Sequence, residues 1–218
     1  VLTDTIMMLS LDLNSGELKA LSLPRDLWSV EYKTKINSLY EYGKQRFPDE
    51  PQRFPREVIQ DLTLVHFDNT FVLTLDQLKE LVDDLGGVPV TIQEGFVDDQ
   101  FPRVDVDIRT EKDPQKLYER VEFTQGTELM TGDRALQFVR SRHSAQLDQG
   151  TDNARSIRQQ LVMNAILVKL KESTTAKDPA VLGKLFDWYY RNFEKSLSIK
   201  ELAQIGYLLQ KKAMYLSL

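Results

Sequence analysis

The sequence predicts an α/β protein with a mixed central β-sheet, helices on both faces of that sheet and a small peripheral β-hairpin. Three observations support this class. Short apolar runs separated by turn residues indicate strands in the first half of the chain. Apolar residues at helical spacing indicate helices between those strands. Residues 173–218 contain helical patterns alone, so we expect helices and sheet to pack as layers.

The chain length and composition favour one globular domain over residues 1–218. The chain has 218 residues, of which 41% are hydrophobic and 28% are charged, enough for a core. It contains no cysteine, which excludes disulfides and cysteine nucleophiles. No apolar run reaches the length of about 18 residues that a membrane span requires. The net charge of −5 and the pI of about 5.2 argue against nucleic acid as a partner.

The first element is a β-hairpin. Two apolar runs, Thr5–Leu13 and Leu18–Leu23, flank the turn residues Asn14-Ser15-Gly16. Pro24-Arg25-Asp26 follows directly, so Arg25 lies where a strand ends. Strand ends and the loops after them often carry functional side chains.

The next segment is less regular. We expect a short helix at Lys35–Tyr42 and an irregular excursion at Lys44–Arg56, which contains three prolines. Pro55 is acceptable in the first turn of a helix, so Phe54–Leu62 is predicted to be helical. Phe67–Leu73 is predicted to be a strand.

Helices and strands then alternate up to the helical C-terminal part. Leu85 is followed by Gly86-Gly87, a helix stop, and Ser198 with Glu201 forms a capping box. The predicted elements are helices at Asp76–Leu85, Thr131–Val139, Asp152–Lys171, Pro179–Phe193 and Ser198–Met214, a strand at Val88–Ile92 and a hairpin within Gly95–Arg109.

A basic region in this acidic chain is the main functional signal. Between Thr131 and Lys171 there are seven Arg or Lys residues and only three Asp. Arg140 and Arg142 diverge by about 200° on a helix but converge if the chain leaves the helix there. Arg155 and Arg158 share one face at the start of the next helix, where free N–H groups also attract anions. A phosphate or carboxylate ligand is expected.

A plainer interpretation stays open at this point. These arginines also suit helix ends that face solvent, where they would pair with the acidic residues of the same region. Those residues are Asp133, Asp148 and Asp152.

The basic region also resembles a known signature. VRSRH at Val139–His143, a loop, and DNARSIRQQ at Asp152–Gln160 resemble the LytR–CpsA–Psr family of cell-wall glycopolymer ligases, with Ala154 where glycine is usual. Further similar segments follow the family's order: TDTIMMLSLD (Thr3–Asp12), LSLPRD (Leu21–Asp26), KIN (Lys35–Asn37) and LDQLKELVDDLGGVPV (Leu75–Val90). The proline-rich excursion departs from the family pattern, in which a longer helix continues.

The resemblance implies an activity and a location. Enzymes of this family transfer a glycopolymer from a polyprenyl-pyrophosphate carrier to peptidoglycan, forming a phosphodiester with Mg²⁺ as cofactor. A member acts at the outer face of the bacterial cytoplasmic membrane. We therefore expect an N-terminal strand and an anchor helix upstream of Val1. We also expect the protein to be a transferase whose partners are the glycopolymer-carrying polyprenyl pyrophosphate and peptidoglycan.

The resemblance also assigns site residues. Arg25, Arg140, Arg142, Arg155 and Asp4 are the expected catalytic residues, and Asp4 is the expected Mg²⁺ ligand together with an aspartate upstream of this chain. Asp4 and that upstream aspartate both remain candidates for the general base. The expected substrate-binding residues are Asp26, Lys35, Asn37, His143, Arg158 and Gln159.

Two alternatives remain from the sequence. One is a non-catalytic polyprenyl-phosphate-binding module, or a cell-envelope regulator, with the same fold. The other is an unrelated regulator that binds nucleic acid or a sugar-phosphate effector, which the low pI disfavours.

Overall fold

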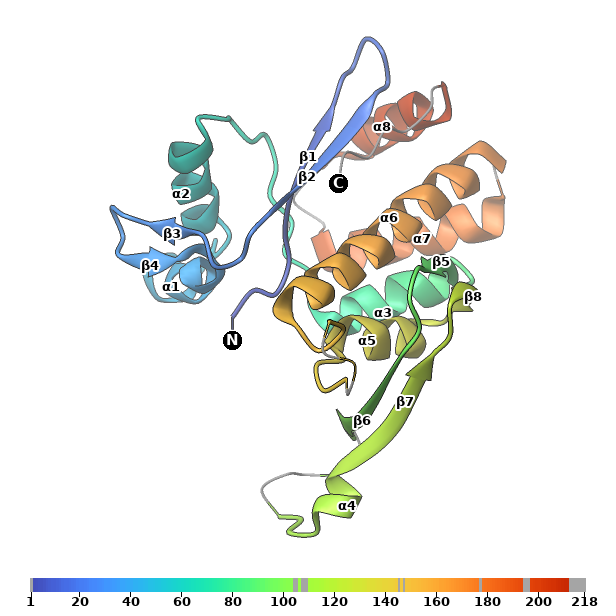
Figure 1. The fold of residues 1–218 in the computed structure, drawn as a ribbon. Helices are drawn as coiled ribbons and strands as arrows, with labels where there is room; N and C mark the ends of the chain where they lie inside the picture. The colour runs from blue at the N-terminus through green and yellow to red at the C-terminus, as the bar shows by residue number, and fades with distance from the viewer. Residues whose placement is uncertain are drawn as a thin grey trace. The chain divides into compact units, whose positions relative to one another are not determined.

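The computed structural model describes residues 2–103, 106, 110–144, 146, 148–176, 178–193 and 197–211. The chain folds as two compact units, each of which is described by itself. The first unit comprises Val1–Thr74, Thr174–Asp178 and Phe186–Leu218, and the second comprises Leu75–Ser173 and Pro179–Leu185. Figure 1 shows helices and small antiparallel sheets along the chain, which confirms the α/β class.

The predicted N-terminal hairpin is confirmed. Strand β1 (Ile6–Leu11) pairs antiparallel with β2 (Leu18–Leu23), with Ile6 opposite Leu23 and Leu11 opposite Leu18. Gly16 takes a φ of +72° in the turn, a conformation that favours glycine. The Asp12 carboxylate accepts the N–H groups of Asn14 and Ser15 at 2.8 and 3.1 Å, and these bonds lower the pKa of Asp12.

Two helices follow a second, very short hairpin. The elements are β3 (Trp28–Ser29), β4 (Thr34–Lys35), the 3₁₀ helix η1 (Ile36–Ser38), α1 (Leu39–Arg46) and α2 (Arg53–Thr63). The side chains of Ile36, Leu39, Phe54 and Val58 form a buried cluster between them. The helices predicted near Lys35 and Phe54 are therefore confirmed, and their apolar faces pack against each other.

Two expectations for this segment are wrong. The irregular excursion is confined to Phe47–Gln52, because α1 continues to Arg46 and α2 already begins at Arg53. Pro55 is the third residue of α2, where the missing N–H has no intrahelical partner to lose. Phe67–Leu73 forms no strand, because Phe71 packs its ring against Tyr189 and Phe193, at centroid distances of 6.5 and 5.3 Å.

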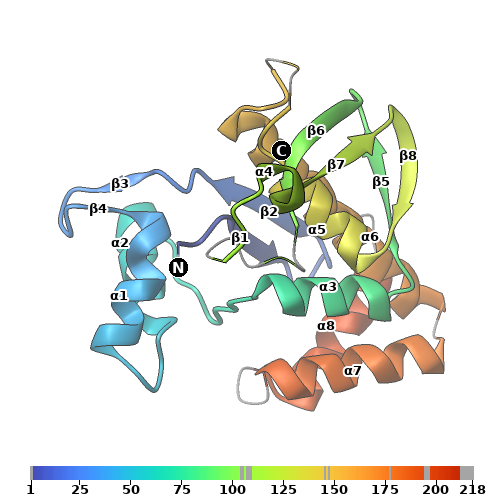
Figure 2. The ribbon, with the colours of Figure 1, turned by 90° about the horizontal axis from the view of Figure 1, so that it is seen from below.

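The second unit begins with a capped helix. Helix α3 (Leu75–Asp84) ends at Gly86 and Gly87, with φ of +75° and +91°, and the Gly87 N–H donates to Val82 O at 2.9 Å. This is the stop that the Gly-Gly pair predicted. Figure 2 shows α3 beside α5 (Gly132–Arg140). The two approach closely at Gly132, whose N–H donates to the Asp83 carboxylate at 2.7 Å.

The strands of the second unit pair in two antiparallel ribbons. β5 (Val88–Ile92) pairs with β8 (Gly126–Met130), and β6 (Phe96–Pro102) pairs with β7 (Tyr118–Phe123). Of the hairpin expected within Gly95–Arg109, the first strand is β6, but its partner is β7. Residues 104, 105 and 107–109 lie outside the described part of the chain.

One detail of the predicted architecture differs from the structure. Among the described residues the strands form four two-stranded antiparallel sheets rather than one mixed sheet. Strands that return through a short turn pair antiparallel, whereas parallel pairing needs a long crossover. The hairpin β1–β2 returns in this way.

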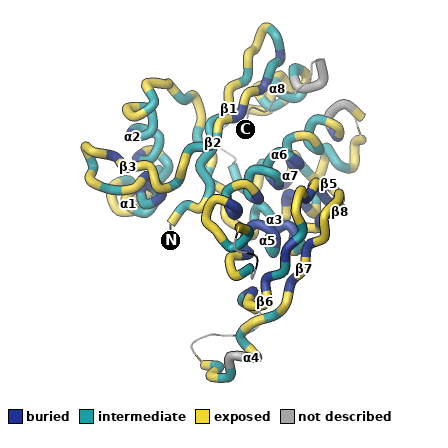
Figure 3. The backbone as a smooth tube through the Cα atoms, viewed as in Figure 1, coloured by how far each residue is buried: buried dark blue, intermediate teal, exposed yellow. Residues whose placement is uncertain are grey.

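Aromatic side chains form the core of the second unit. The rings of Phe96, Phe123 and Phe138 lie 4.9 to 5.9 Å apart, and Val88 and Val90 are also buried. Figure 3 colours buried positions on β5, β6 and α5, which alternate with more exposed ones along the two strands. It holds the end of α5, and therefore Arg140, on a packed support.

Helices α7 (Pro179–Phe193) and α8 (Ile199–Lys211) confirm the helical C-terminal part. The other helices are the short α4 (Pro114–Leu117) and the long α6 (Asp152–Ala176), which corresponds to the helix predicted at Asp152–Lys171. Ser198 and Glu201 form the predicted capping box, with Ser198 N–H to Glu201 Oε2 at 2.8 Å and Glu201 N–H to Ser198 Oγ at 3.3 Å. None of the helices in the described part of the chain combines the length and apolar character of a membrane span.

Candidate functional site

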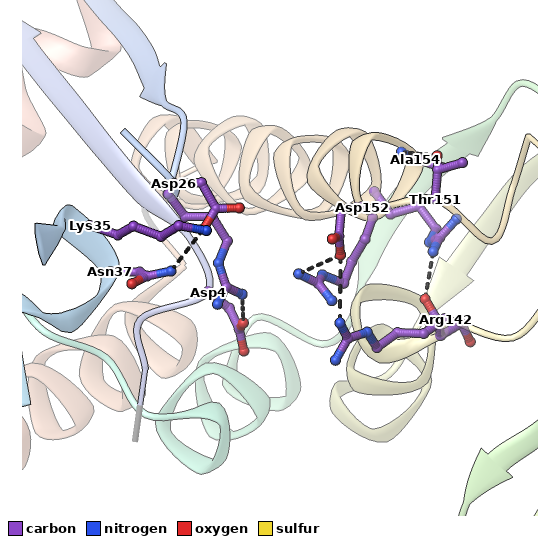
Figure 4. A network of polar contacts seen from close by, with 12 residues as sticks. Asp4, Asp26, Lys35, Asn37, Arg142, Thr151, Asp152 and Ala154 are labelled. Atoms are coloured by element: carbon purple, nitrogen blue, oxygen red, sulfur yellow. Dashed lines mark hydrogen bonds and ion pairs between the residues drawn. The ribbon is translucent and has the colours of Figure 1, made fainter. Parts of the chain in front are cut away.

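The predicted site residues fall in two groups, one in each unit. In the first unit, Arg25 lies two residues after the end of β2, and its Nη1 contacts the carboxylate of Asp4 (Figure 4). The Arg25 side chain is 19% exposed and that of Asp4 is 54% exposed. The contact places a carboxylate and a guanidinium side by side at the surface of this unit.

Asn37 connects the other residues of the first group. Its backbone N–H donates to Arg25 O at 3.1 Å, and its own carbonyl accepts the Thr3 N–H at 2.9 Å. The Nδ2 of Asn37 and the Nζ of Lys35 both reach Asp26 Oδ1, at 3.1 and 3.0 Å. Asn37 is 3% exposed, so it fixes the two segments that carry Asp4 and Arg25.

In the second unit, a carboxylate bridges two of the predicted arginines. Asp152 Oδ1 lies 3.0 Å from Arg155 Nη2 and 3.6 Å from Arg142 Nη2 (Figure 4). Thr151 caps the N-terminus of α6, because its Oγ1 accepts the Ala154 N–H at 3.1 Å. Two guanidinium groups thus meet at the N-terminus of α6, where an anion is favoured.

Arg140 is the last residue of α5 and stays within the second group. Its guanidinium lies 5.5 Å from the ring centroid of Phe101. Among the described residues Arg140 makes no ion pair with a carboxylate, which leaves its charge available to an anion.

Arg158 is bound differently from the other arginines. It is 3% exposed, and it donates to three backbone carbonyls: Nε to Phe138 O at 3.1 Å, Nη1 to Gln149 O at 3.0 Å and Nη2 to Ser141 O at 2.6 Å. Burial lowers the pKa of Arg158 to about 10, with Asp98 opposing that shift and Arg155 adding to it. Arg158 therefore stays charged at neutral pH and holds the chain on both sides of Arg140.

Sequence reasoning missed Asp98. Its carboxylate is fully buried and accepts the N–H groups of Arg142, His143 and Gln100, at 2.9, 3.2 and 3.0 Å. The available signal was its position on the strand. Asp98 lies two residues after Phe96 on β6, so both side chains point to the same, buried side of the strand. An acidic residue on a buried face has to be paired, and such a residue is a site candidate.

The other predicted residues lie beside these groups. His143 is exposed and touches Asp98 through its backbone, whereas Gln159 is half-buried next to Arg158 on α6. In the described part of the chain, no three His, Cys, Asp or Glu side chains are grouped to hold a metal ion. The Mg²⁺ role of Asp4 and the individual binding roles therefore stay predictions.

Comparison with known proteins addresses the family. The LytR–CpsA–Psr family model matches residues 1–215. The protein belongs to the LytR–CpsA–Psr family. The family signature predicted from VRSRH and DNARSIRQQ is therefore confirmed.

Relatives of this LytR–CpsA–Psr protein carry cell-wall names. It is 25% identical over 205 residues to the polyisoprenyl-teichoic acid–peptidoglycan teichoic acid transferase TagV of Bacillus subtilis, covering 91% of this chain and 46% of TagV. It is 28% identical over 207 residues to the cell wall biosynthesis protein LcpA of Corynebacterium glutamicum, covering 85% of this chain and 36% of LcpA. The chain thus spans less than half the length of these relatives.

Solved structures show the same fold. The crystal structure of Bacillus subtilis TagV superimposes with a TM-score of 0.66 at 20% identity, covering 99% of this chain and 76% of TagV. TagT with bound octaprenyl pyrophosphate lipid superimposes with a TM-score of 0.62 at 18% identity, covering 100% of this chain and 72% of TagT. The described elements therefore have the fold of these two structures.

Proposed function

We propose that this protein transfers a glycopolymer from a polyprenyl-pyrophosphate carrier to peptidoglycan. The observation that carries the proposal is the arginine arrangement at the start of α6, where Arg142 and Arg155 meet one carboxylate and Arg140 precedes them. A diphosphate is an anion of the kind that such guanidinium groups bind with two parallel hydrogen bonds. The name of TagV and the lipid bound to TagT support this substrate class.

The reaction is a phosphoryl transfer. A hydroxyl oxygen of peptidoglycan attacks the phosphorus nearest the glycopolymer, and the bond from that phosphorus to the bridging oxygen breaks. Polyprenyl phosphate leaves, and the polymer remains attached to peptidoglycan as a phosphodiester. Such transfers depend mainly on positioning and on neutralising charge in the transition state. Arg140, Arg142 and Arg155 of the second unit would supply positive charge for this purpose, and Arg25 of the first unit keeps the role that the family resemblance gives it.

Asp4 is the proposed protein ligand of Mg²⁺. Its carboxylate is half-exposed and already lies beside a guanidinium, so an incoming diphosphate would meet both groups. One carboxylate with phosphate oxygens and water is a common way of holding Mg²⁺. The bound ion would neutralise negative charge on the diphosphate. Two carboxylates are candidates to accept the proton of the attacking hydroxyl. One is Asp4, if it does not hold the ion, and the other is an aspartate upstream of this chain.

The remaining predicted residues support this centre. Asp26 orients Lys35 and Asn37 through the hydrogen bonds it accepts from them. His143 and Gln159 flank the arginine group and are proposed to contact the substrate, while Arg158 keeps the loop around Arg140 in place. We further propose that the chain works at the outer face of the cytoplasmic membrane, held by an anchor upstream, with residues 1–218 as one catalytic domain.

The test is thermal stabilisation by polyprenyl pyrophosphate, with and without Mg²⁺. A ligand at a hundred times its Kd stabilises the folded state by about 2.7 kcal/mol, which raises the Tm by roughly 5–10 °C in a chain of this size. We expect this shift in the wild type and its loss in Arg140→Ala. Arg120→Ala is the matched control, because Arg120 is an exposed arginine on β7 of the same unit.

Three results have distinct meanings. Absence of a shift in the wild type refutes the diphosphate site. Equal shifts in the wild type and Arg140→Ala refute the role of Arg140. A shift without transfer of polymer to isolated peptidoglycan favours the binding module over the enzyme.

Mg²⁺ is tested separately by calorimetric titration of Mg²⁺ into the protein with inorganic pyrophosphate present. Asp4→Asn is expected to weaken Mg²⁺ binding, and Asp12→Asn, which changes an exposed turn residue, is expected to leave it unchanged. Equal Mg²⁺ affinities in the two variants would show that Asp4 is not a ligand of the ion.

A further inference from the structure

The buried carboxylate of Asp98 has no assigned role in the proposed reaction. We infer that Asp98 is a positioning residue, which acts together with Arg158 to hold the loop of Arg140 and Arg142 ready for the diphosphate. This inference rests on the proposed function, because it concerns the same arginines. Asp98 touches no reacting atom itself.

Asp98 holds the loop by accepting hydrogen bonds from the backbone N–H groups of the loop. Its Oδ2 accepts the backbone N–H of Arg142 at 2.9 Å and of His143 at 3.2 Å, and a bridge pairs Asp98 with Ser144. Its Oδ1 accepts the Gln100 N–H at 3.0 Å, where the β6–β7 register shifts. Bulges of this kind re-aim side chains and are common near active sites.

Arg158 holds the same loop by donating hydrogen bonds to backbone carbonyl groups of the loop and of the end of α5. It binds Phe138 O and Ser141 O, which stand on either side of Arg140, and Gln149 O farther along. The loop is therefore fixed by a buried anion at its N–H groups and by a buried cation at its C=O groups. Arg158 also lies 4.6 Å from the ring centroid of Phe96, two residues before Asp98 on β6.

This use of buried charge requires an explanation. A buried ionised group is unfavourable unless hydrogen bonds and an opposite charge compensate it. Both charges are compensated here, and both are directed at the backbone of one loop rather than at solvent. The Arg142 side chain, in contrast, is 59% exposed and extends from this fixed backbone. A loop that is ordered before binding avoids the entropy loss of ordering it on the ligand.

The test compares Asp98→Asn with Asp99→Asn. The first change removes one carboxylate oxygen from the loop N–H groups or from Gln100, and the second removes the same charge from an exposed neighbour that pairs with Arg120 at 3.0 Å. Binding of inorganic pyrophosphate with Mg²⁺ is measured by calorimetry. Hydrogen bonds to charged groups correspond to about tenfold to a hundredfold in affinity, and we expect a loss of this size for Asp98→Asn alone.

A double-mutant cycle separates positioning from a general loss of structure. In an Arg142→Ala background, Asp98→Asn should have a smaller effect than in the wild type, because one of the two arginines that it positions is gone. In an Arg25→Ala background the two losses should add, since Arg25 belongs to the other unit. Equal losses in both backgrounds would mean that Asp98 only stabilises the fold, and would overturn the inference.

Hydrogen exchange of the wild type gives an answer even if Asp98→Asn does not fold. The amides of Arg142 and His143 should be protected without ligand and unchanged by inorganic pyrophosphate. Protection that arises only with pyrophosphate would overturn the idea of a loop ordered in advance. If the wild type binds no pyrophosphate, the proposed function fails together with this role. If it binds and Asp98→Asn binds equally well, only the role of Asp98 fails.

Discussion

Replacing Arg158 by lysine should destabilise the second unit strongly, although the charge is conserved. The guanidinium of Arg158 donates from all three nitrogens to the carbonyls of Phe138, Ser141 and Gln149. A lysine ammonium is a single nitrogen on a flexible stem and cannot occupy the three positions of the planar fork. At least two of the three carbonyls lose their charged donor in Arg158→Lys.

The magnitude follows from those two bonds. Each hydrogen bond to a charged group contributes about 1.5–3 kcal/mol, and neighbouring bonds are not additive, so we expect a loss of about 3 kcal/mol. For a chain of 218 residues this lowers the Tm by roughly 6–12 °C.

The loss should also depend on pH. Burial lowers the pKa of Arg158 to about 10, and the same burial would lower the pKa of a lysine from a smaller starting value. The unfolded variant then binds more protons than the folded variant over the interval between the two pKa values. The stability of Arg158→Lys should therefore rise with pH through that interval and be lowest on its acid side.

Urea denaturation followed by circular dichroism measures this effect. Arg120→Lys is the control, because the Arg120 side chain is 60% exposed and pairs with Asp99 and Glu122 on the surface. Exposed pairs contribute at most about 1 kcal/mol, so the control should lie close to the wild type. If Arg158→Lys and Arg120→Lys unfold at the same urea concentration, the three carbonyl bonds do not stabilise the fold as argued.

Three further predictions concern single positions. Asp152→Asn removes the carboxylate that occupies two arginines, so the affinity for inorganic pyrophosphate should rise by calorimetry, and a fall would contradict the pairing. Leu64 ends α2 with a φ of +56° and is 92% exposed, so Leu64→Gly should raise stability by about 0.5–1 kcal/mol, and a lower Tm would count against this. Hydrogen bonds from the Ser198 hydroxyl and then from its backbone N–H lower the pKa of Glu201. The stability of the α8 cap is therefore present above the ordinary pKa of a glutamate and is lost as pH falls through the lowered value. Ser198→Ala removes only the hydroxyl bond, so it should weaken that pH dependence in far-ultraviolet circular dichroism, and an unchanged dependence would contradict this.

Local signals in the sequence predicted much of the fold. Ser198 forms a helix cap as expected, and Gly86-Gly87 ends α3. The helix predicted to begin at Thr131 is capped by that residue, whose Oγ1 accepts the Arg134 N–H. These features depend on residues close in the chain, so sequence patterns contain them. Phe71 shows the opposite case. Its segment has strand composition, yet its ring packs against α7, more than a hundred residues later.

The candidate site divides in the same way. The VRSRH and DNARSIRQQ segments predicted the arginines, because each segment is local. Asp98 contacts Arg142 across 44 positions in the chain, and the pairing exists only because β6 carries the carboxylate to the loop. A single sequence gives the phase of Asp98 on its strand but not the loop that it meets.

Arg155 and Arg158 show what residue spacing can and cannot decide. Their separation of three placed them on one helix face, and both are indeed nearly buried, at 6% and 3% exposure. Their partners differ, since Arg155 pairs with the carboxylate of Asp152 while Arg158 binds backbone carbonyls. A carboxylate can be replaced at a guanidinium by a phosphate that offers the same geometry. Carbonyls of the chain can be replaced only if the loop unfolds. Arg142 and Arg155, which can exchange Asp152 for a substrate, are therefore among the arginines proposed to bind the diphosphate, and Arg158 is the residue that keeps their surroundings in position.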